Sequence, residues 1–243
     1  MIDEWGKGAK YWDHAWNPMI GCRKISEGCA NCYAERICTR FGQWKHSDFQ
    51  PQPGNCGKPP RKGVVFVGNM TDIFGEWNDP IQIVEWLYKL DDRAENLILT
   101  KRPERMAKLI AGINPMRRAW WGTTAENEKR YAERLLNLWK IRTPQVKTWI
   151  SFEPLIGPID LMTGHYIPFP FDWVVVGAES GPNRRRCDLQ WVRNIVWQCG
   201  KAGVPVFVKQ LDIGGKLVKD IEKFPEDLQI RQVPWKKGMR EER

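Results

Sequence analysis

The stretch WVVVGAESGPNRRRCDLQWVRNIVWQCGKAGVPVFV, residues 173–208, contains a complete strand–helix–strand unit. The apolar runs Trp173–Val176 and Pro205–Val208 predict two buried strands. Between them, Asp188 is placed to cap a helix whose apolar residues recur at three- and four-residue steps. Short apolar strands joined by a helix are typical of neighbouring parallel strands. The stretch therefore predicts an α/β fold with a parallel sheet.

The same alternation of strands and helices begins at residue 64. Further strands are expected at Tyr11–Trp16, Val64–Val67, Asn96–Thr100, Ala119–Gly122 and Lys147–Ser151. Further helices are expected from Tyr33 to about Phe41, after a cap at Asp79, from Pro103 to near Gly112, and after a capping box formed by Thr123 and Glu126. This pattern predicts a single-domain α/β protein, a partial or complete parallel TIM-like (β/α) barrel, with a doubly wound open sheet as the alternative.

The predicted barrel spans residues 1–213, and residues 214–243 form a C-terminal extension. A Pro/Gly-rich insertion at 50–63 reads as an ordered flap or a mobile loop. In both candidate architectures, ligands bind at the carboxyl ends of the strands.

Composition bears on compartment and partners. The 243 residues include 38 Lys and Arg against 29 Asp and Glu, which gives a net charge of +9 and suits a nucleic-acid partner. Ordinary solubility charge is the alternative. The seven cysteines are an odd, clustered set, and no apolar leader opens the sequence, so we expect a cytoplasmic protein without a disulfide framework. The longest apolar runs are strand-sized, so no membrane role is expected.

Three cysteines, Cys22, Cys29 and Cys32, fall where the first strand would end and the first helix begin. A Cys-x2-Cys pair lets two thiolates reach one metal centre, and the third cysteine makes a three-point clamp. Structural zinc needs a fourth ligand, for which His14 or Cys38 are candidates, and free thiols are a further alternative. In a four-iron cluster with three protein ligands, one iron keeps an open position.

The segment GCRKISEGCANCYAE, residues 21–35, resembles the cluster loop of the radical S-adenosylmethionine superfamily. That resemblance implies a [4Fe-4S] cluster on Cys22, Cys29 and Cys32, S-adenosyl-L-methionine as a second cofactor, and an external electron donor. Its implied chemistry is reductive cleavage to a 5′-deoxyadenosyl radical. The sequence departs from the commonest pattern of the superfamily in its six-residue first gap and in Tyr33, which follows the last cysteine.

More of the chain is similar to a phage-associated family of uncharacterised proteins that also occurs in bacteria. The similarity rests on AWNPMIGCRKISEGCANCYAE, LTKRPERM, SFEPLIGPIDL and VVVGAESGPNRRR, which lie between residue 15 and about residue 210. No activity is carried over from that family.

Polar side chains follow six successive predicted strands, where a plain core would not need them. The candidates for cofactor binding are Asn69, Asp72, Lys101, Arg102, Thr124, Glu126, Ser151 and Glu153, and the candidates for catalysis are Glu179 and Lys209. The superfamily resemblance implies that Asn69 meets the methionine amino group, Thr124 or Glu126 the ribose, and Lys101 or Arg102 the carboxylate. A capping role for Glu126 and a Lys101–Glu153 ion pair are structural alternatives.

The segment GAESGPNRRR, residues 177–186, lacks the Gly-Lys-Ser/Thr ending of a P-loop, so nucleotide hydrolysis is not expected. Arg184 to Arg186 are candidates for phosphate contacts, with a solvated loop as the alternative. The sequence as a whole predicts a radical S-adenosylmethionine enzyme acting on a nucleic-acid base or nucleotide. A non-catalytic, zinc-containing nucleic-acid-binding barrel is the alternative.

Overall fold

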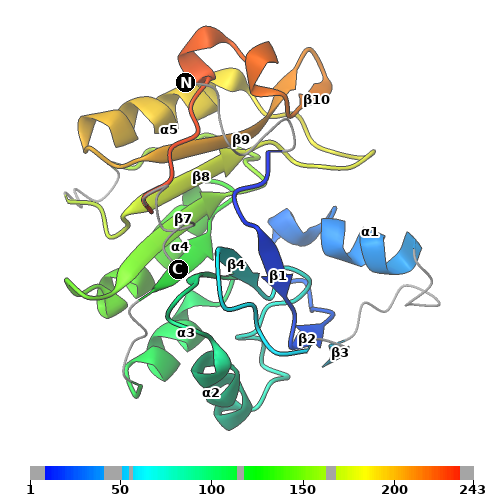
Figure 1. Ribbon diagram of the computed structural model, residues 1–243. Helices are drawn as coiled ribbons and strands as arrows, with labels where there is room; N and C mark the ends of the chain where they lie inside the picture. Colours follow the sequence, from blue (N-terminus) through cyan, green and yellow to red (C-terminus); the bar gives the residue numbers. More distant parts are fainter. Residues whose placement is uncertain (1–8, 41–50, 55–56, 114–117, 163–167, 236–243) are drawn as a thin grey trace.

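The structure is a computed structural model that describes residues 9–40, 51–54, 57–113, 118–162 and 168–235. Within these ranges, eight strands form one sheet in the order β1-β4-β5-β6-β7-β8-β9-β10 (Figure 1). Their bounds are β1 His14–Trp16, β4 Val64–Val67, β5 Glu95–Thr100, β6 Ala119–Thr124, β7 Lys147–Phe152, β8 Trp173–Gly177, β9 Val206–Ile213 and β10 Lys216–Val218. All neighbours are parallel except β9 and β10, which confirms the predicted α/β class.

The order of the parallel strands follows the chain without a reversal. A doubly wound sheet reverses its order at a switch point, so that alternative is wrong. β1 and β10 stand at opposite edges and do not pair with each other, so the described strands form an open sheet and not a closed barrel.

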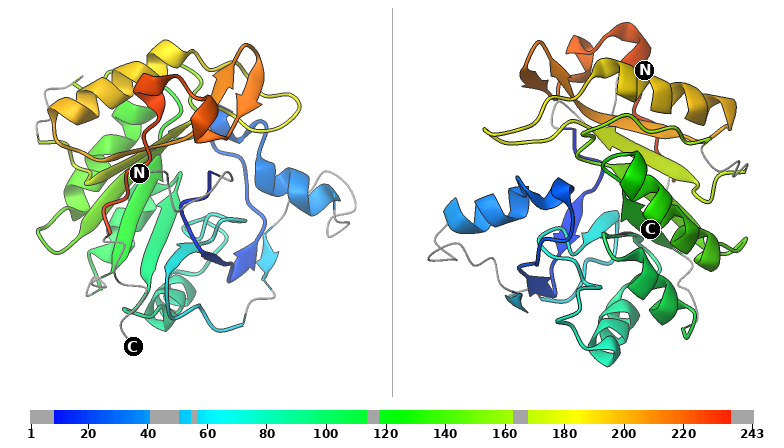
Figure 2. Two further views of the ribbon diagram at one scale, coloured as in Figure 1. Left: turned by 45° about the horizontal axis from the view of Figure 1, so that its top comes forward. Right: turned by 180° about the vertical axis from the view of Figure 1, so that it is seen from behind.

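Four helices cover one face of the sheet, and α1 lies apart from them (Figures 1 and 2). Their bounds are α1 Tyr33–Arg40, α2 Pro80–Lys89, α3 Pro103–Ile110, α4 Glu128–Ile141 and α5 Leu189–Lys201. The last residue predicted for the first helix, Phe41, lies outside the described residues. None of the described helices has the length and apolar character needed to cross a membrane.

Two predicted helix caps are confirmed. Asp79 accepts a hydrogen bond from the backbone N–H of Ile81 at 2.8 Å, and Asp188 accepts one from Gln190 at 2.8 Å.

The predicted capping box at the start of α4 is wrong. Asn127 caps that helix by accepting from the N–H of Arg130 at 3.1 Å. β6 continues to Thr124, so Thr123 is still part of the strand, and its hydroxyl donates to the carbonyl of Thr100 at 2.9 Å.

The sheet face opposite α2–α5 is filled by aromatic rings. Tyr11, fully buried, lies 6.3 Å from the ring of Phe66 on β4 and 5.4 Å from the ring of Phe207 on β9. Trp149 and Trp173, from the strands between, stack 5.1 Å apart. Because rings from β4 and β9 meet the same tyrosine, the sheet curls around this aromatic layer.

Gly122 in β6 makes room for Trp149 in the neighbouring strand. A Cβ atom at Gly122 would lie 2.6 Å from Cε2 of the indole. The indole N–H donates to the carbonyls of Ile98 at 3.1 Å and Trp120 at 3.0 Å. The indole therefore packs directly against the backbone of β6, and only a glycine at residue 122 leaves room for it.

The described part of the predicted C-terminal extension packs onto the sheet. Val208 donates to the carbonyl of Ile230, and Gln232 donates to that of Val206, each at 2.8 Å. Leu228 is completely buried, and the Trp235 ring lies 5.0 Å from Trp173. Residues 216–235 therefore complete the core.

A second, small sheet consists of two antiparallel strands, β2 (Met19–Ile20) and β3 (Gln52–Pro53). β2 comes before the segment with the three cysteines, and β3 comes after α1. β3 belongs to the predicted 50–63 insertion, of which residues 50, 55 and 56 lie outside the described ranges. The loop from Gly21 to Cys32, here called the cysteine loop, connects β2 to α1 at the carboxyl ends of the parallel strands.

Candidate functional site

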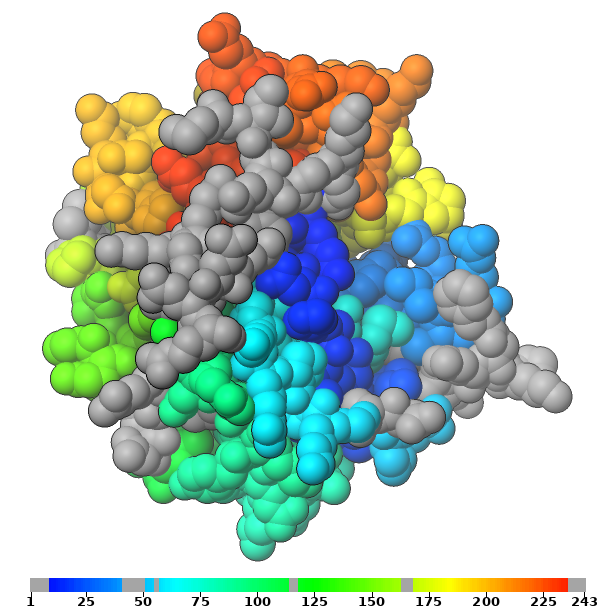
Figure 3. Space-filling model, in the orientation of Figure 1, coloured from blue at the N-terminus to red at the C-terminus, as the bar shows by residue number. Residues whose placement is uncertain are grey.

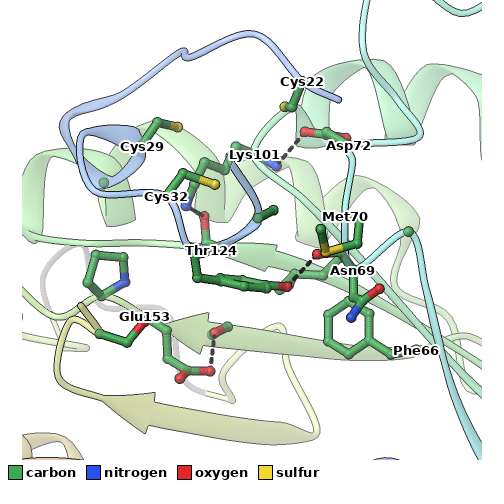
Figure 4. A pocket seen from close by; sticks show the side chains of 18 of the residues that line it. Cys22, Cys29, Cys32, Phe66, Asn69, Met70, Asp72, Lys101, Thr124 and Glu153 are labelled. Carbon is green, nitrogen blue, oxygen red and sulfur yellow. Dashed lines mark hydrogen bonds between the residues drawn. The ribbon is translucent and has the colours of Figure 1, made fainter. Parts of the chain in front are cut away.

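A cavity of about 220 Å³ lies at the carboxyl ends of the parallel strands (Figure 4). Twelve of the thirteen predicted site residues line it: Cys22, Cys29, Cys32, Asn69, Asp72, Lys101, Arg102, Thr124, Ser151, Glu153, Glu179 and Lys209. The exception is Glu126, which is fully buried behind the cavity wall. The rim pattern in the sequence thus identified side chains that come together in the fold.

The three cysteines of the loop are free thiols that face the same side of the cavity (Figure 4). Burial raises the pKa of the Cys22 thiol to about 12, and the nearby Asp72 carboxylate adds to this effect. Burial likewise raises the pKa of Cys32. Repulsion from a neighbouring thiolate adds to both of these shifts, so a bound cation would favour the ionised, metal-ligating form of Cys22 and Cys32.

All three cysteines line the same cavity. Within the described ranges, no three His, Cys, Asp or Glu side chains come close enough together to hold a single metal ion.

The start of the cysteine loop is fixed to the segment after β4. Gly21, with φ of 91°, donates its N–H to the carbonyl of Met70 at 3.1 Å. Thr71 returns a hydroxyl bond to the carbonyl of Gly21 at 2.6 Å. The positive φ explains why glycine stands immediately before Cys22.

Glu126 anchors the middle of the loop from below. Its carboxylate accepts from Ser26 at 2.8 Å, from Lys101 at 2.7 Å and from Arg134 at 3.0 Å. Burial opposes its ionisation, but Lys101 and Arg134 together hold the pKa of Glu126 below its usual value. Gly28 lies against this side chain, since a Cβ at residue 28 would be 2.5 Å from Cδ of Glu126.

Glu27 forms a second anchor, to the start of α4. It accepts from the guanidinium of Arg130 at 2.7 Å and from the amide of Asn127 at 2.6 Å. The Arg130 hydrogen bond is the main reason that the pKa of Glu27 falls to about 2.

Glu179 forms a third anchor, after β8. It accepts from the amide of Asn31 at 2.9 Å and from the backbone and guanidinium of Arg185. Arg185 also donates to the carbonyl of Glu27 at 2.9 Å. With only 3% of its surface exposed and all these partners in place, Glu179 holds the loop, although the sequence pointed to a catalytic role.

Lys209 and Glu153 form a charged pair on the opposite wall. Lys209 Nζ lies 2.9 Å from Glu153 Oε1 and over the rings of Tyr11 and Trp12. Ser151 donates to the other oxygen of Glu153 at 3.2 Å. Burial, reinforced by Glu153, raises the pKa of Tyr11, so its phenol stays protonated.

Asp72 and Arg102 form a structural centre between β4 and β5. Asp72 accepts from Thr100 at 2.7 Å, from the Lys101 N–H at 3.0 Å and from Arg102 at 3.1 Å. Arg102 also donates to Glu76 and to the carbonyl of Arg23 in the cysteine loop. Each of its three guanidinium nitrogens therefore already donates a hydrogen bond.

Several residues that shape the site were not predicted from the sequence: Tyr11, Ser26, Glu27, Asn31 and Arg134. Arg185 was a candidate for phosphate contacts, but it pairs with Glu179 instead. Ser26, Glu27 and Asn31 stand between the cysteines, and polar residues inside a metal-type loop are a usable signal for such anchors. Arg134 lies on α4 among other charged residues, and no pattern distinguishes it.

The sequence matches the family described as "Protein of unknown function (DUF5131)" over residues 7–232. No curated protein and no solved structure matches the chain. The family match includes the cysteine loop and every strand end that lines the cavity. The chain therefore belongs to the DUF5131 family.

Proposed function

We propose that the protein is a radical S-adenosylmethionine enzyme that holds a [4Fe-4S] cluster and modifies a nucleic-acid base or a nucleotide. The observation that carries the proposal is the cavity shared by Cys22, Cys29, Cys32 and polar side chains from successive strand ends. Parallel strands in chain order, curled around one aromatic layer, support the partial barrel that the resemblance implies.

The donor set fits such a cluster. Three thiolates are soft ligands typical of iron–sulfur centres, and here the three cysteines line one cavity of about 220 Å³. In this proposal Cys22, Cys29 and Cys32 hold the cluster. Bound there, the cluster and S-adenosylmethionine would supply radical chemistry, in which one electron from an external donor cleaves S-adenosylmethionine to methionine and a 5′-deoxyadenosyl radical able to take a hydrogen atom from the substrate.

The side chains after β4, β5 and β6 hold S-adenosylmethionine in this proposal. Asn69 Oδ1, fixed by the Asn17 amide at 2.8 Å, keeps a lone pair for the methionine ammonium. Thr124 accepts from Lys101 at 2.8 Å, so its own hydroxyl proton is available for a ribose oxygen. Glu126 does not take that role, because it is completely buried and does not line the cavity.

The methionine carboxylate falls to Lys101 and not to Arg102. Arg102 is 6% exposed and already donates to Asp72, Glu76 and a backbone carbonyl. Lys101 donates to Thr124 and Glu126, which leaves its third ammonium proton for a ligand.

The substrate side of the cavity is the wall with Glu153 and Lys209. This pair is the charged group of the far wall, and the aromatic rings beneath it keep bulk water from the floor. Lys209 is therefore the proton donor that we assign to the substrate, while Glu179 is reassigned to holding the cysteine loop.

The test is anaerobic purification followed by metal and product analysis. The wild-type protein is expected to be brown, with about four irons and four sulfides per chain, and to form 5′-deoxyadenosine after reduction. Cys29→Ala is expected to lose both properties. Cys199→Ala, which changes a cysteine buried on the opposite face, is the control and is expected to keep them. A colourless protein with one zinc per chain, or product formation by Cys29→Ala, would contradict the proposal.

A further inference from the structure

Two arginines beside the cavity carry charges that no carboxylate among the described residues balances. Arg36 lies exposed on α1, and Arg184 lies in the loop between β8 and α5. Neither forms an ion pair with any residue in the described ranges. By contrast, the cations that line the cavity are each paired with a carboxylate: Lys101 with Glu126, Arg102 with Asp72, and Lys209 with Glu153.

The two guanidinium groups meet at Gly181. That of Arg36 occupies the space beside Gly181 where a Cβ atom would project. That of Arg184 lies 3.5 Å from the carbonyl oxygen of Gly181. The α1 helix and this loop are in contact on the right of the molecule in Figure 3. Ser180, the preceding residue, lines the cavity, so the pair stands at its rim.

The electrostatics of this arrangement favour a bound anion. Arginine cannot lose its proton in a protein, so two adjacent guanidinium groups repel each other until an anion or solvent compensates them. In addition, Nε of Arg184 is buried without a hydrogen-bond acceptor in the described structure. A donor of this kind is expected to have a partner, and none of the described residues supplies one.

The neighbouring Arg185 shows that the arginine run Arg184 to Arg186 is divided by function. Arg185 turns inward, pairs with Glu179 and bonds the carbonyl of Glu27. Arg184 is instead left with backbone carbonyls of Gly181 and Gly215. The contacts of Arg185 thus support the cysteine loop, whereas those of Arg184, made to neutral carbonyls, leave a full positive charge at the rim of the cavity.

We infer that Arg36 and Arg184 bind a backbone phosphate of a nucleic-acid strand. Two planar guanidinium forks suit phosphate oxygens, and a net charge of +9 draws a polyanion to the protein. A base attached to that phosphate can enter the cavity past Tyr33 and Trp12, whose rings offer stacking surfaces. The entry of the base rests on the proposed function, but the phosphate site does not.

The experiment measures binding of a fluorescent single-stranded DNA 12-mer, and of the same sequence as RNA and as duplex DNA, to the anaerobically purified full-length protein. Arg36→Ala and Arg184→Ala are each expected to weaken binding of the preferred strand by about 10-fold at low salt. Each is also expected to reduce the slope of log K against log salt by about 0.7 for a single strand or 0.9 for a duplex. Lys201→Ala, which removes one charge from the far end of α5, is the control and should bind like the wild type.

Unchanged affinity and salt slope in both arginine variants would overturn the inference. So would an equal loss of affinity for poly-glutamate, which would show a generic cationic surface. Arg36→Ala is a change at an exposed helical position and is not expected to unfold the protein. The iron content of the wild-type protein separates the two proposals: arginine-dependent DNA or RNA binding by a wild-type protein that is colourless and iron-free supports the phosphate site while the enzymatic proposal fails.

Discussion

Gly28 lies directly against the buried carboxylate of Glu126, in the middle of the cysteine loop. The carboxylate is neutralised by Lys101 and Arg134 and bonded by Ser26, so it cannot move without breaking an ion network. At the scale of single residues, the positions between the cysteines are therefore constrained as strongly as the cysteines. They determine where the thiols of Cys29 and Cys32 point.

Gly28→Ala tests this constraint. The added methyl group overlaps Glu126, so we expect the loop to shift, the free energy of unfolding to fall by about 1–3 kcal/mol, and iron retention to drop. Urea denaturation and metal analysis measure these effects.

The matched control for Gly28→Ala is Gly200→Ala. A Cβ at Gly200 in α5 meets nothing within 4 Å, and alanine there is expected to stabilise the helix by about 0.5–1 kcal/mol. A stable Gly28→Ala variant with full iron content would show that the loop does not depend on Glu126.

At the scale of elements, α5 shows how the outer face of the sheet is built. Val192, Ile195 and Cys199 recur at helical spacing, and each is completely buried against the sheet. Burial raises the pKa of the Cys199 thiol to about 12. The helix therefore contributes a protonated thiol to the core, remote from the cysteine loop.

This thiol makes stability fall at alkaline pH. A raised folded-state pKa means that its contribution is fully present below the unfolded value of about 8.5, and is lost as the pH rises toward 12. The expected slope is at most about 1.4 kcal/mol per pH unit.

Cys199→Ala removes that slope, so its difference in unfolding free energy from the wild type should shrink between pH 8 and pH 11. Urea unfolding at several pH values measures it. Parallel curves for the two proteins would contradict a buried, protonated Cys199.

The elements themselves were largely predictable, because strands buried on both faces and amphipathic helices leave clear periodicities. The strand Val64–Val67 and the caps Asp79 and Asp188 were predicted as they are found. The predicted box at Thr123 failed because a capping motif and a strand end share the same residue types. The prediction that the polar side chains after the strands lie close together followed from the topology, because the carboxyl ends of parallel strands meet at one edge of the sheet.

The roles of the rim residues could not be predicted. Glu179 became an anchor of the cysteine loop because it meets Arg185, whose position depends on the conformation of the loop before α5. Glu126 became one because it meets Arg134, and that pairing depends on the angle at which α4 crosses the sheet. Local sequence patterns carry no information on that angle.

At the scale of the whole molecule, the C-terminal residues belong to the sheet and not to an appendage. Ile230 and Gln232 pair with the edge of β9 that β8 leaves free. Phe224 and Leu228 enter the same core as α5. The domain is therefore complete only when the described residues up to 235 are in place.

Leu228→Ala tests this role. Leu228 is completely buried, so the cavity left by the change should lower the free energy of unfolding by about 2–5 kcal/mol. Leu136→Ala, on the exposed face of α4, should change it by at most about 0.5 kcal/mol. Thermal and urea denaturation compare the two, and equal stabilities would mean that the C-terminal segment is dispensable.

The close fit of Trp149 into the space at Gly122 has an evolutionary consequence. Any descendant of this sequence that gains a side chain at residue 122 must replace the indole at 149 with something smaller, or lose two carbonyl partners in the sheet. Residues 122 and 149 should therefore change together among diverging members of the lineage. Sequences with tryptophan at 149 should keep glycine at 122, and sequences with a larger residue at 122 should have a smaller one at 149.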